Sequence, residues 1–119
     1  MALTNTPFQT NNAIVGKPDA ITATSDTVAA SIETLTTEIT TNGDSDLDHV
    51  SLADGVEGQI KHFAVVAVGN AADSVDIVPA SLAGFTQITF AANPLGKGCT
   101  MYFDGTNWSV TGTHAGTVA

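Results

Sequence analysis

Apolar and polar residues alternate on both sides of an Asp-Gly pair near the end of the chain. Asp104 and Gly105 separate two such runs, 99–103 and 106–110. This pair favours a two-residue type I′ turn, in which both central residues have positive φ. Pairing outward from the turn predicts three opposed pairs: Phe103 with Thr106, Met101 with Trp108, and Cys99 with Val110. One face of this hairpin is apolar, and because an isolated hairpin is only marginally stable in water, other strands must cover it.

The same alternation recurs upstream, with turn residues about every ten positions, as in an all-β sandwich or barrel. The longest apolar run, 60–68, changes from alternation to residues that are apolar on both faces. That change predicts a central strand. Shorter strands are expected at 49–52, 75–78 and 87–90. The residues predicted to fill the core are Phe63, Ile77, Phe90, Met101, Phe103 and Trp108.

Segment 20–41 fits two secondary structures. A helical interpretation rests on apolar residues spaced three or four apart: Val28, Ile32, Leu35 and Ile39. Ser25 and Asp26 precede most of that helix and are good capping residues. The dense β-branched content, with threonines at 34, 36, 37, 40 and 41, favours strands instead. We therefore predict two strands with a break between them.

The N-terminal stretch differs from the rest of the chain. It is rich in Asn and Thr, contains Pro7 and ends near Pro18, and its apolar residues follow neither the helical nor the strand period. We predict an extended arm over 1–19 that binds a neighbouring subunit or another partner by adding to a strand edge. Its apolar residues are the candidate partner contacts: Leu3, Phe8, Ile14 and Val15. The predicted fold is all-β: an antiparallel β-sandwich or barrel-like domain over 20–119 behind this extended N-terminal arm.

Composition points to assembly. The 119 residues are 43% hydrophobic but only 13% charged, and the mean hydropathy is +0.18. An average soluble domain has about 25% charged residues, so the excess apolar surface needs an explanation. A Thr, Ser and Asn-rich β surface is one explanation, and burial against other subunits is the one we favour. We therefore expect a homo-oligomer.

Charge excludes one class of partner. The net charge is −9, from 12 acidic residues against three lysines and no arginine, so no basic stripe can neutralise phosphates. Direct nucleic-acid binding is not expected. No apolar run has membrane length, and the N-terminus lacks the features of a signal peptide, so we expect no membrane partner and no export. The single cysteine, Cys99, is expected to be a small core residue.

The alternate spacing of Asp44, Asp46 and Asp48 resembles the start of a calcium-binding loop. The motif is incomplete, because His49 stands in place of the loop glycine and Gly55 in place of the bidentate glutamate. A solvated acidic loop is the interpretation we favour. The histidines, at 49, 62 and 114, have no metal-ligand spacing. We predict no metal and no cofactor.

Catalytic signatures are absent from the sequence. There is no glycine-rich phosphate loop, no nucleophile elbow and no cysteine-centred motif, so we expect no enzyme. Aromatic residues can also line a glycan-binding surface. Trp108 is better explained as a core residue, whereas Tyr102 is predicted on the opposite, polar face of the hairpin.

Four segments, in chain order, carry a resemblance to a known group of proteins: 52–61, 75–80, 84–90 and 102–110. They resemble small β-rich virion proteins of tailed bacteriophages, which include head-decoration proteins and the β domains of head and tail fibres. The resemblance covers roughly 31–119 by its succession of alternating strands. The terminal segment 115–119 is also similar to that group, whereas the first thirty or so residues are not.

The resemblance implies a structural virion protein. It implies a capsid decoration or cement protein, made in the host cytoplasm, that binds the major capsid protein on the outer surface of the head and stabilises it. It also implies a symmetric homo-oligomer, often a trimer. The alternative is a tail or head fibre module involved in binding the host receptor.

Overall fold

The computed structural model describes residues 16–119, and all regular structure in that range is β-strand. The strands are, in chain order, β1 (Asp19–Ala23), β2 (Val28–Ala30), β3 (Thr36–Thr41), β4 (Leu47–Leu52), β5 (Ile60–Ala67), β6 (Ser74–Pro79), β7 (Ile88–Phe90), β8 (Gly98–Phe103), β9 (Trp108–His114) and β10 (Thr117–Val118). Segment 20–41 is not helical. It contains three strands rather than the predicted two.

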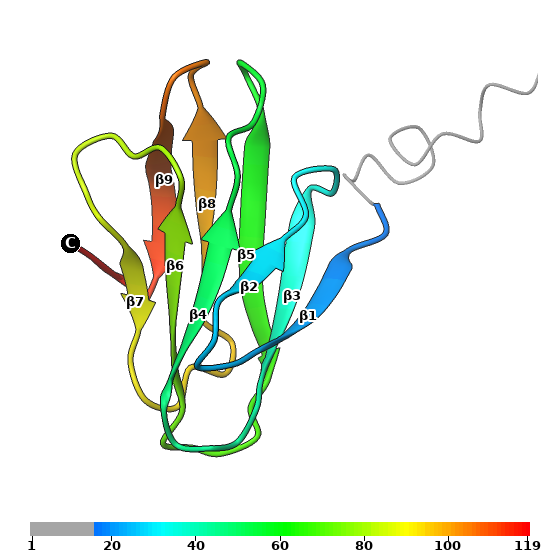
Figure 1. Ribbon diagram of the computed structural model, residues 1–119, viewed down its shortest axis with the longest axis vertical. Helices are drawn as coiled ribbons and strands as arrows, with labels where there is room; N and C mark the ends of the chain where they lie inside the picture. The colour runs from blue at the N-terminus through cyan, green and yellow to red at the C-terminus, as the bar shows by residue number, and fades with distance from the viewer. Residues whose placement is uncertain (1–15) are drawn as a thin grey trace, which may run out of the picture.

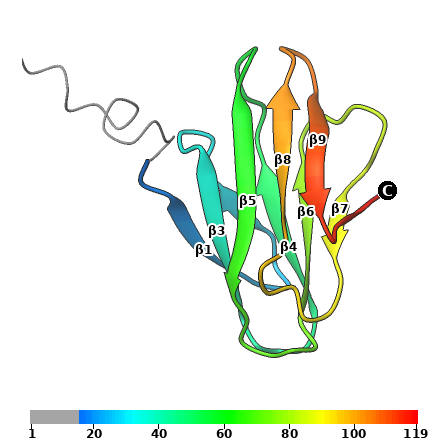
Figure 2. The same ribbon diagram turned by 180° about the vertical axis from the view of Figure 1, so that it is seen from behind.

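Two five-stranded sheets pack face to face. The first has the order β1-β3-β5-β8-β9 and the second β10-β7-β6-β4-β2. The second sheet lies in front in Figure 1 and the first in Figure 2. The predicted all-β fold is confirmed, and β5, expected as a central strand, is the middle strand of the first sheet. The two sheets do not close into a barrel.

The prediction of an antiparallel sandwich was wrong, because both sheets are mixed. Strands β1 to β6 alternate between the two sheets, so that β1, β3 and β5 are parallel neighbours in one and β2, β4 and β6 in the other. Each parallel connection uses a strand of the opposite sheet as its crossover. Strands β7 to β10 then pair antiparallel. Alternation along a strand reveals its buried face but not the direction of its neighbour.

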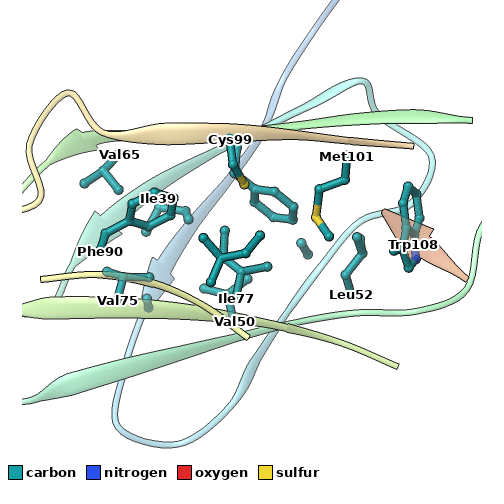
Figure 3. Close-up of a cluster of buried hydrophobic side chains, with 14 of the residues drawn as sticks. Ile39, Val50, Leu52, Val65, Val75, Ile77, Phe90, Cys99, Met101 and Trp108 are labelled. Carbon is teal, nitrogen blue, oxygen red and sulfur yellow. The ribbon is translucent and has the colours of Figure 1, made fainter. Parts of the chain in front are cut away.

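The core lies between the inner faces of the sheets (Figure 3). All six residues predicted for the core are buried, and so is Cys99. The other buried apolar residues are Ala23, Ala30, Ile39, Val50, Leu52, Val65, Val75 and Ile88. The four candidate contacts of the predicted arm lie outside the described residues. Residues 16–18 form no regular structure, and β1 begins at Asp19, which we had placed in the arm.

The predicted register of the β8–β9 hairpin was wrong by two residues next to the turn and by three beyond the bulge, where Cys99 pairs with Thr113 rather than Val110. Phe103 pairs with Trp108 rather than Thr106, which leaves a four-residue loop over 104–107. Gly105 has a φ of 99°, but Asp104 does not have the positive φ that a type I′ turn requires. Instead, Asp104 Oδ1 accepts hydrogen bonds from the main-chain N–H groups of residues 106 (2.8 Å) and 107 (2.7 Å). Next to the turn, a shift of two keeps the paired side chains, Met101, Phe103, Trp108 and Val110, on their predicted face.

Candidate functional site

The outer face of the first sheet carries a regular array of side chains over β5, β8 and β9. Residues facing inward on these strands, such as Phe63 and Met101, are buried, so the residues between them face out. Strand pairing arranges the outward residues in three rows: Ile60 with Tyr102 and Ser109, His62 with Thr100 and Gly112, and Ala64 with Gly98 and His114.

One end of this face is apolar. Ile60 is 50% exposed, Tyr102 38% and Leu35 37%, and we call these three residues the apolar row. Leu35 is held beside β5 by a 2.8 Å hydrogen bond from the main-chain N–H of His62 to its carbonyl oxygen. A hollow of about 290 Å³ lies here, lined by Leu35, Thr36, Ile60 and His62. Grouped exposed apolar side chains of this kind mark interaction surfaces.

The other end of the face is hollowed where side chains are missing. This hollow, which we call the glycine groove, has a volume of about 320 Å³ and includes Ala64, Gly98 and Gly112 in its lining. A Cβ atom at Gly98 would collide with the carbonyl oxygen of Phe63, so that position requires glycine. A Cβ at Gly112 would meet nothing within 4 Å. Thr111 forms a β-bulge, because Met101 pairs with residue 110 and Thr100 with residue 112.

The ionisable side chains that line the glycine groove are all basic, although the protein as a whole is acidic. The side chains of His62, Lys97 and His114 line it, and no acidic residue does. Lys97 Nζ donates a 3.1 Å hydrogen bond to the carbonyl oxygen of Ala91, which holds it beside the groove. The groove therefore favours anionic groups over cationic ones.

The β3–β4 loop, which contains Asp44 and Asp46, is held in place by a residue of another loop, Asp73. Asp73 lies in the loop before β6 and is buried. The carboxylate of Asp73 accepts four hydrogen bonds, from Thr41 Oγ1 (2.5 Å) and from the main-chain N–H groups of Gly43 (3.0 Å), Ser45 (2.7 Å) and Asn70 (3.1 Å). These bonds, the one from Thr41 above all, lower the pKa of Asp73. Asp73 thus joins the β3–β4 loop to the β5–β6 loop.

Asp48 is the opposite case. It is buried, its Oδ2 accepts only a long 3.4 Å hydrogen bond from the N–H of Asn42, and its Oδ1 has no hydrogen-bond partner. Burial, with smaller contributions from the carboxylates of Asp44, Asp73 and Asp46, raises the pKa of Asp48. Within the part of the chain that the structure describes, no three His, Cys, Asp or Glu side chains are grouped so as to hold a metal ion.

Sequence reasoning missed Lys61, which is fully buried. Its Nζ donates to the carbonyl oxygens of Ser31 (2.7 Å) and Thr34 (3.0 Å) and to Thr34 Oγ1 (3.0 Å). Burial lowers the pKa of Lys61 to about 8, against a smaller opposing effect of Asp19. The signal was present, because Lys61 is two positions from Phe63 and therefore shares its inward face.

The histidines fall on two different surfaces. His49 lies on the second sheet, where its Nδ1 is 2.7 Å from Oδ1 of Asp76, and His62 and His114 line the glycine groove on the first. Among residues 16–119, no hydrogen bond connects the ring of His49 to a Ser, Thr or Cys side chain. Covalent catalysis uses a nucleophile, a base and a group that orients the base. The His49–Asp76 pair could supply only the last two of these.

Comparisons with protein-family models, curated proteins and solved structures found no match to this chain. Over residues 16–119 there is no helix with the length and apolarity needed to cross a membrane. Function is therefore inferred from the outer face of the first sheet and from the resemblance in the sequence.

Proposed function

We propose that this protein is a structural virion component: a capsid decoration or cement protein that binds the major capsid protein on the outer surface of the head. The observation that carries the proposal is the apolar row of Leu35, Ile60 and Tyr102. The sandwich buries a complete core between its sheets, yet it leaves these three large side chains exposed. Such a row is suited to contacts between subunits, and the sequence resembles phage decoration proteins.

The mechanism is mass action. A protein that binds the assembled head but not its free subunits stabilises the assembled state by its binding free energy. In a homo-oligomer, for which a trimer is the arrangement we favour, several binding segments act together and increase the overall affinity. The N-terminal segment 1–15 is proposed as one of them. It joins the domain at β1, an edge strand of the first sheet, where a neighbour can pair through its main chain.

A fibre module that binds a host receptor is the second candidate. Two large apolar side chains in connecting loops favour it: Val56, 71% exposed between β4 and β5, and Leu95, 55% exposed between β7 and β8. In that function the loops, rather than the apolar row, contact the partner.

Binding of purified protein to assembled heads tests the proposal. Ile60→Lys places a charge in the apolar row and should abolish cosedimentation with heads, whereas Val56→Lys, an equal change at an exposed loop, should not. Head binding that survives Ile60→Lys, together with loss of binding to host cells in Val56→Lys, would favour the fibre module. Copy number gives a second measure, since a decoration protein is present in on the order of hundreds of copies per virion and a fibre in a few tens at most.

Deletion of residues 1–17 tests the role of the N-terminal segment. The truncated domain should fold, because the core residues of the described range 16–119 all lie downstream of the deletion, but its affinity for heads should fall. Undiminished binding would assign attachment to the folded domain alone. Circular dichroism and light scattering on the same sample report the fold and the oligomer.

A further inference from the structure

The glycine groove is a second feature of the outer face, and it differs from the apolar row in shape and charge. Gly98 lies two positions before Thr100 on β8, Gly112 pairs with Thr100 from β9, and Ala64 pairs with Gly98 from β5. The absence of side chains at these positions lets the main chain of a partner come close to the sheet. The volume, about 320 Å³, is at the lower end of the range of about 300–1,000 Å³ typical of ligand sites.

We propose that the glycine groove binds an extended acidic segment of a partner protein. The argument is charge complementarity. The chain has 12 acidic residues and none lines the groove, whereas one of its three lysines and two of its three histidines do. A carboxylate placed over Gly98 would lie between these basic groups, which can donate charge-assisted hydrogen bonds to it.

The position of the groove indicates that the bound segment is extended. It crosses three strands and ends at β9, an edge strand of the first sheet. Residues Thr111 to His114 of that strand are exposed and carry no acidic side chain. A segment without regular structure of its own can follow such a groove and place alternate side chains in it.

One acidic residue limits the affinity. Glu38 pairs with Ala64 from β3, so it shares the outer face and lies beside the groove without lining it. Its carboxylate repels an acidic ligand across that side. Glu38→Gln should therefore strengthen binding of the acidic segment, whereas a purely structural effect of the substitution would not.

The proposal for the groove does not depend on whether the protein decorates a capsid.

The experiment uses the full chain, labelled with ¹⁵N, and a short peptide of alternating threonine and aspartate. Matching threonine–asparagine and threonine–lysine peptides are controls. The acidic peptide should cause saturable shifts at the amides of Gly98, Gly112 and His114, and added salt should reduce them. Absence of saturable shifts, shifts elsewhere, or equal shifts with the asparagine peptide would overturn the proposal.

A variant that fills the groove gives the sharper test. Gly112→Leu adds a side chain where nothing lies within 4 Å of the new Cβ, so it should fold and lower the affinity for the acidic peptide about tenfold or more, which is about 1.4 kcal/mol. Ala29→Leu adds similar bulk at an exposed position of β2 on the other sheet and should bind like the unchanged protein. Unchanged binding by Gly112→Leu would overturn the proposal.

Two further results decide the remaining cases. If Gly112→Leu fails to fold, Lys97→Gln with His114→Gln removes two basic groups from the surface, and retention of full affinity in that variant would contradict the proposal. If the amides of Gly98 and Gly112 shift with protein concentration in the absence of peptide, the groove binds a second copy of this chain. That result would overturn the assignment to a different protein.

Discussion

The two halves of the chain build one sandwich in different ways. In the parallel half, 19–79, successive strands belong to opposite sheets. Every connecting loop in this half therefore crosses from one sheet to the other at an end of the sandwich. The antiparallel half, 88–118, completes both sheets and includes the β8–β9 hairpin. The parallel half uses buried ionisable side chains to hold its loops, and the hairpin uses an exposed one.

The difference follows from loop packing. The β3–β4 and β5–β6 loops approach so closely that a Cβ on Gly69 would lie 2.6 Å from the main-chain nitrogen of Gly43. Where loops pack this closely, their part-buried N–H groups need partners within the protein. Asp73 supplies acceptors for one pair of loops, and Lys61 supplies donors for the β2–β3 loop. In the hairpin, Asp104 serves a loop that water also reaches.

Trp108→Ala should have the largest effect, because Trp108 joins the two halves. Its indole N–H donates a 2.9 Å hydrogen bond to the carbonyl oxygen of Ala53 in the parallel half, and its ring lies 5.1 Å from that of Phe103. Loss of a buried tryptophan costs about 3–5 kcal/mol out of a total stability of about 5–15 kcal/mol. Urea unfolding measures the loss. Tyr102→Ala, at an exposed position of the same hairpin, should cost much less, and equal losses would show that Trp108 is not a core anchor.

The sequence predicted the features that are set within a single strand, such as which of its side chains are buried. Alternation identified the buried side chains of the hairpin, and the change of pattern at 60–68 identified the middle strand of the first sheet. The prediction assumed a two-residue turn with positive φ at Asp104. The actual four-residue turn is stabilised instead by the Asp104 side chain, which accepts hydrogen bonds from two of its main-chain N–H groups. Propensity for Asp-Gly does not distinguish these two turns.

The features that depend on several strands could not be predicted. Asp73 holds amides of Gly43 and Ser45 about thirty positions earlier, and only the parallel pairing of the strands brings them together. The glycine groove likewise requires the bulge at Thr111, which places Gly112 opposite Thr100 and beside Gly98. Neither the direction of a neighbouring strand nor a bulge leaves a mark in the hydrophobic pattern.

Asp73→Asn should have the second-largest effect. The amide has one oxygen instead of two, so it cannot accept all four hydrogen bonds, and it leaves the buried Thr41 hydroxyl or part-buried N–H groups of the two loops without partners. The pKa of Asp73 is lowered, so its contribution to stability is complete above its ordinary pKa of about 3.9 and is lost as the pH falls through the lower folded value. Unfolding followed from pH 7 to pH 2 should show a smaller acid loss in the variant.

Asp48→Asn is the matched control, with the opposite expected sign. The pKa of Asp48 is raised by burial, so its charged form destabilises the folded state above that raised pKa. The same exchange of carboxylate for amide should leave the stability at pH 7 unchanged or higher. A large loss in Asp48→Asn would contradict the distinction between the anchored carboxylate of Asp73 and the unanchored one of Asp48, in β4.

Lys61→Met tests the buried donor of the parallel half through pH dependence. The pKa of Lys61 falls to about 8 in the folded state, against an ordinary 10.5. Between these values the unfolded chain binds more protons than the folded one, so stability should rise with pH from about 8 to about 10. The methionine variant should lack this rise. A similar slope in both proteins would show that Lys61 keeps its ordinary pKa in spite of its burial.

Asp104→Ala should have the smallest effect, and it completes the comparison between the halves. Asp104 and Asp73 each accept hydrogen bonds from several main-chain N–H groups, and the pKa of each is lowered by such bonds. Asp104 is exposed, so water can replace its carboxylate when it is removed. We expect a small decrease in the urea midpoint, larger than that of Thr106→Ala, whose side chain forms no hydrogen bond in the described structure. If Asp104→Ala destabilised the protein as much as Asp73→Asn, burial would not be what separates the two halves, and the number of hydrogen bonds would decide instead.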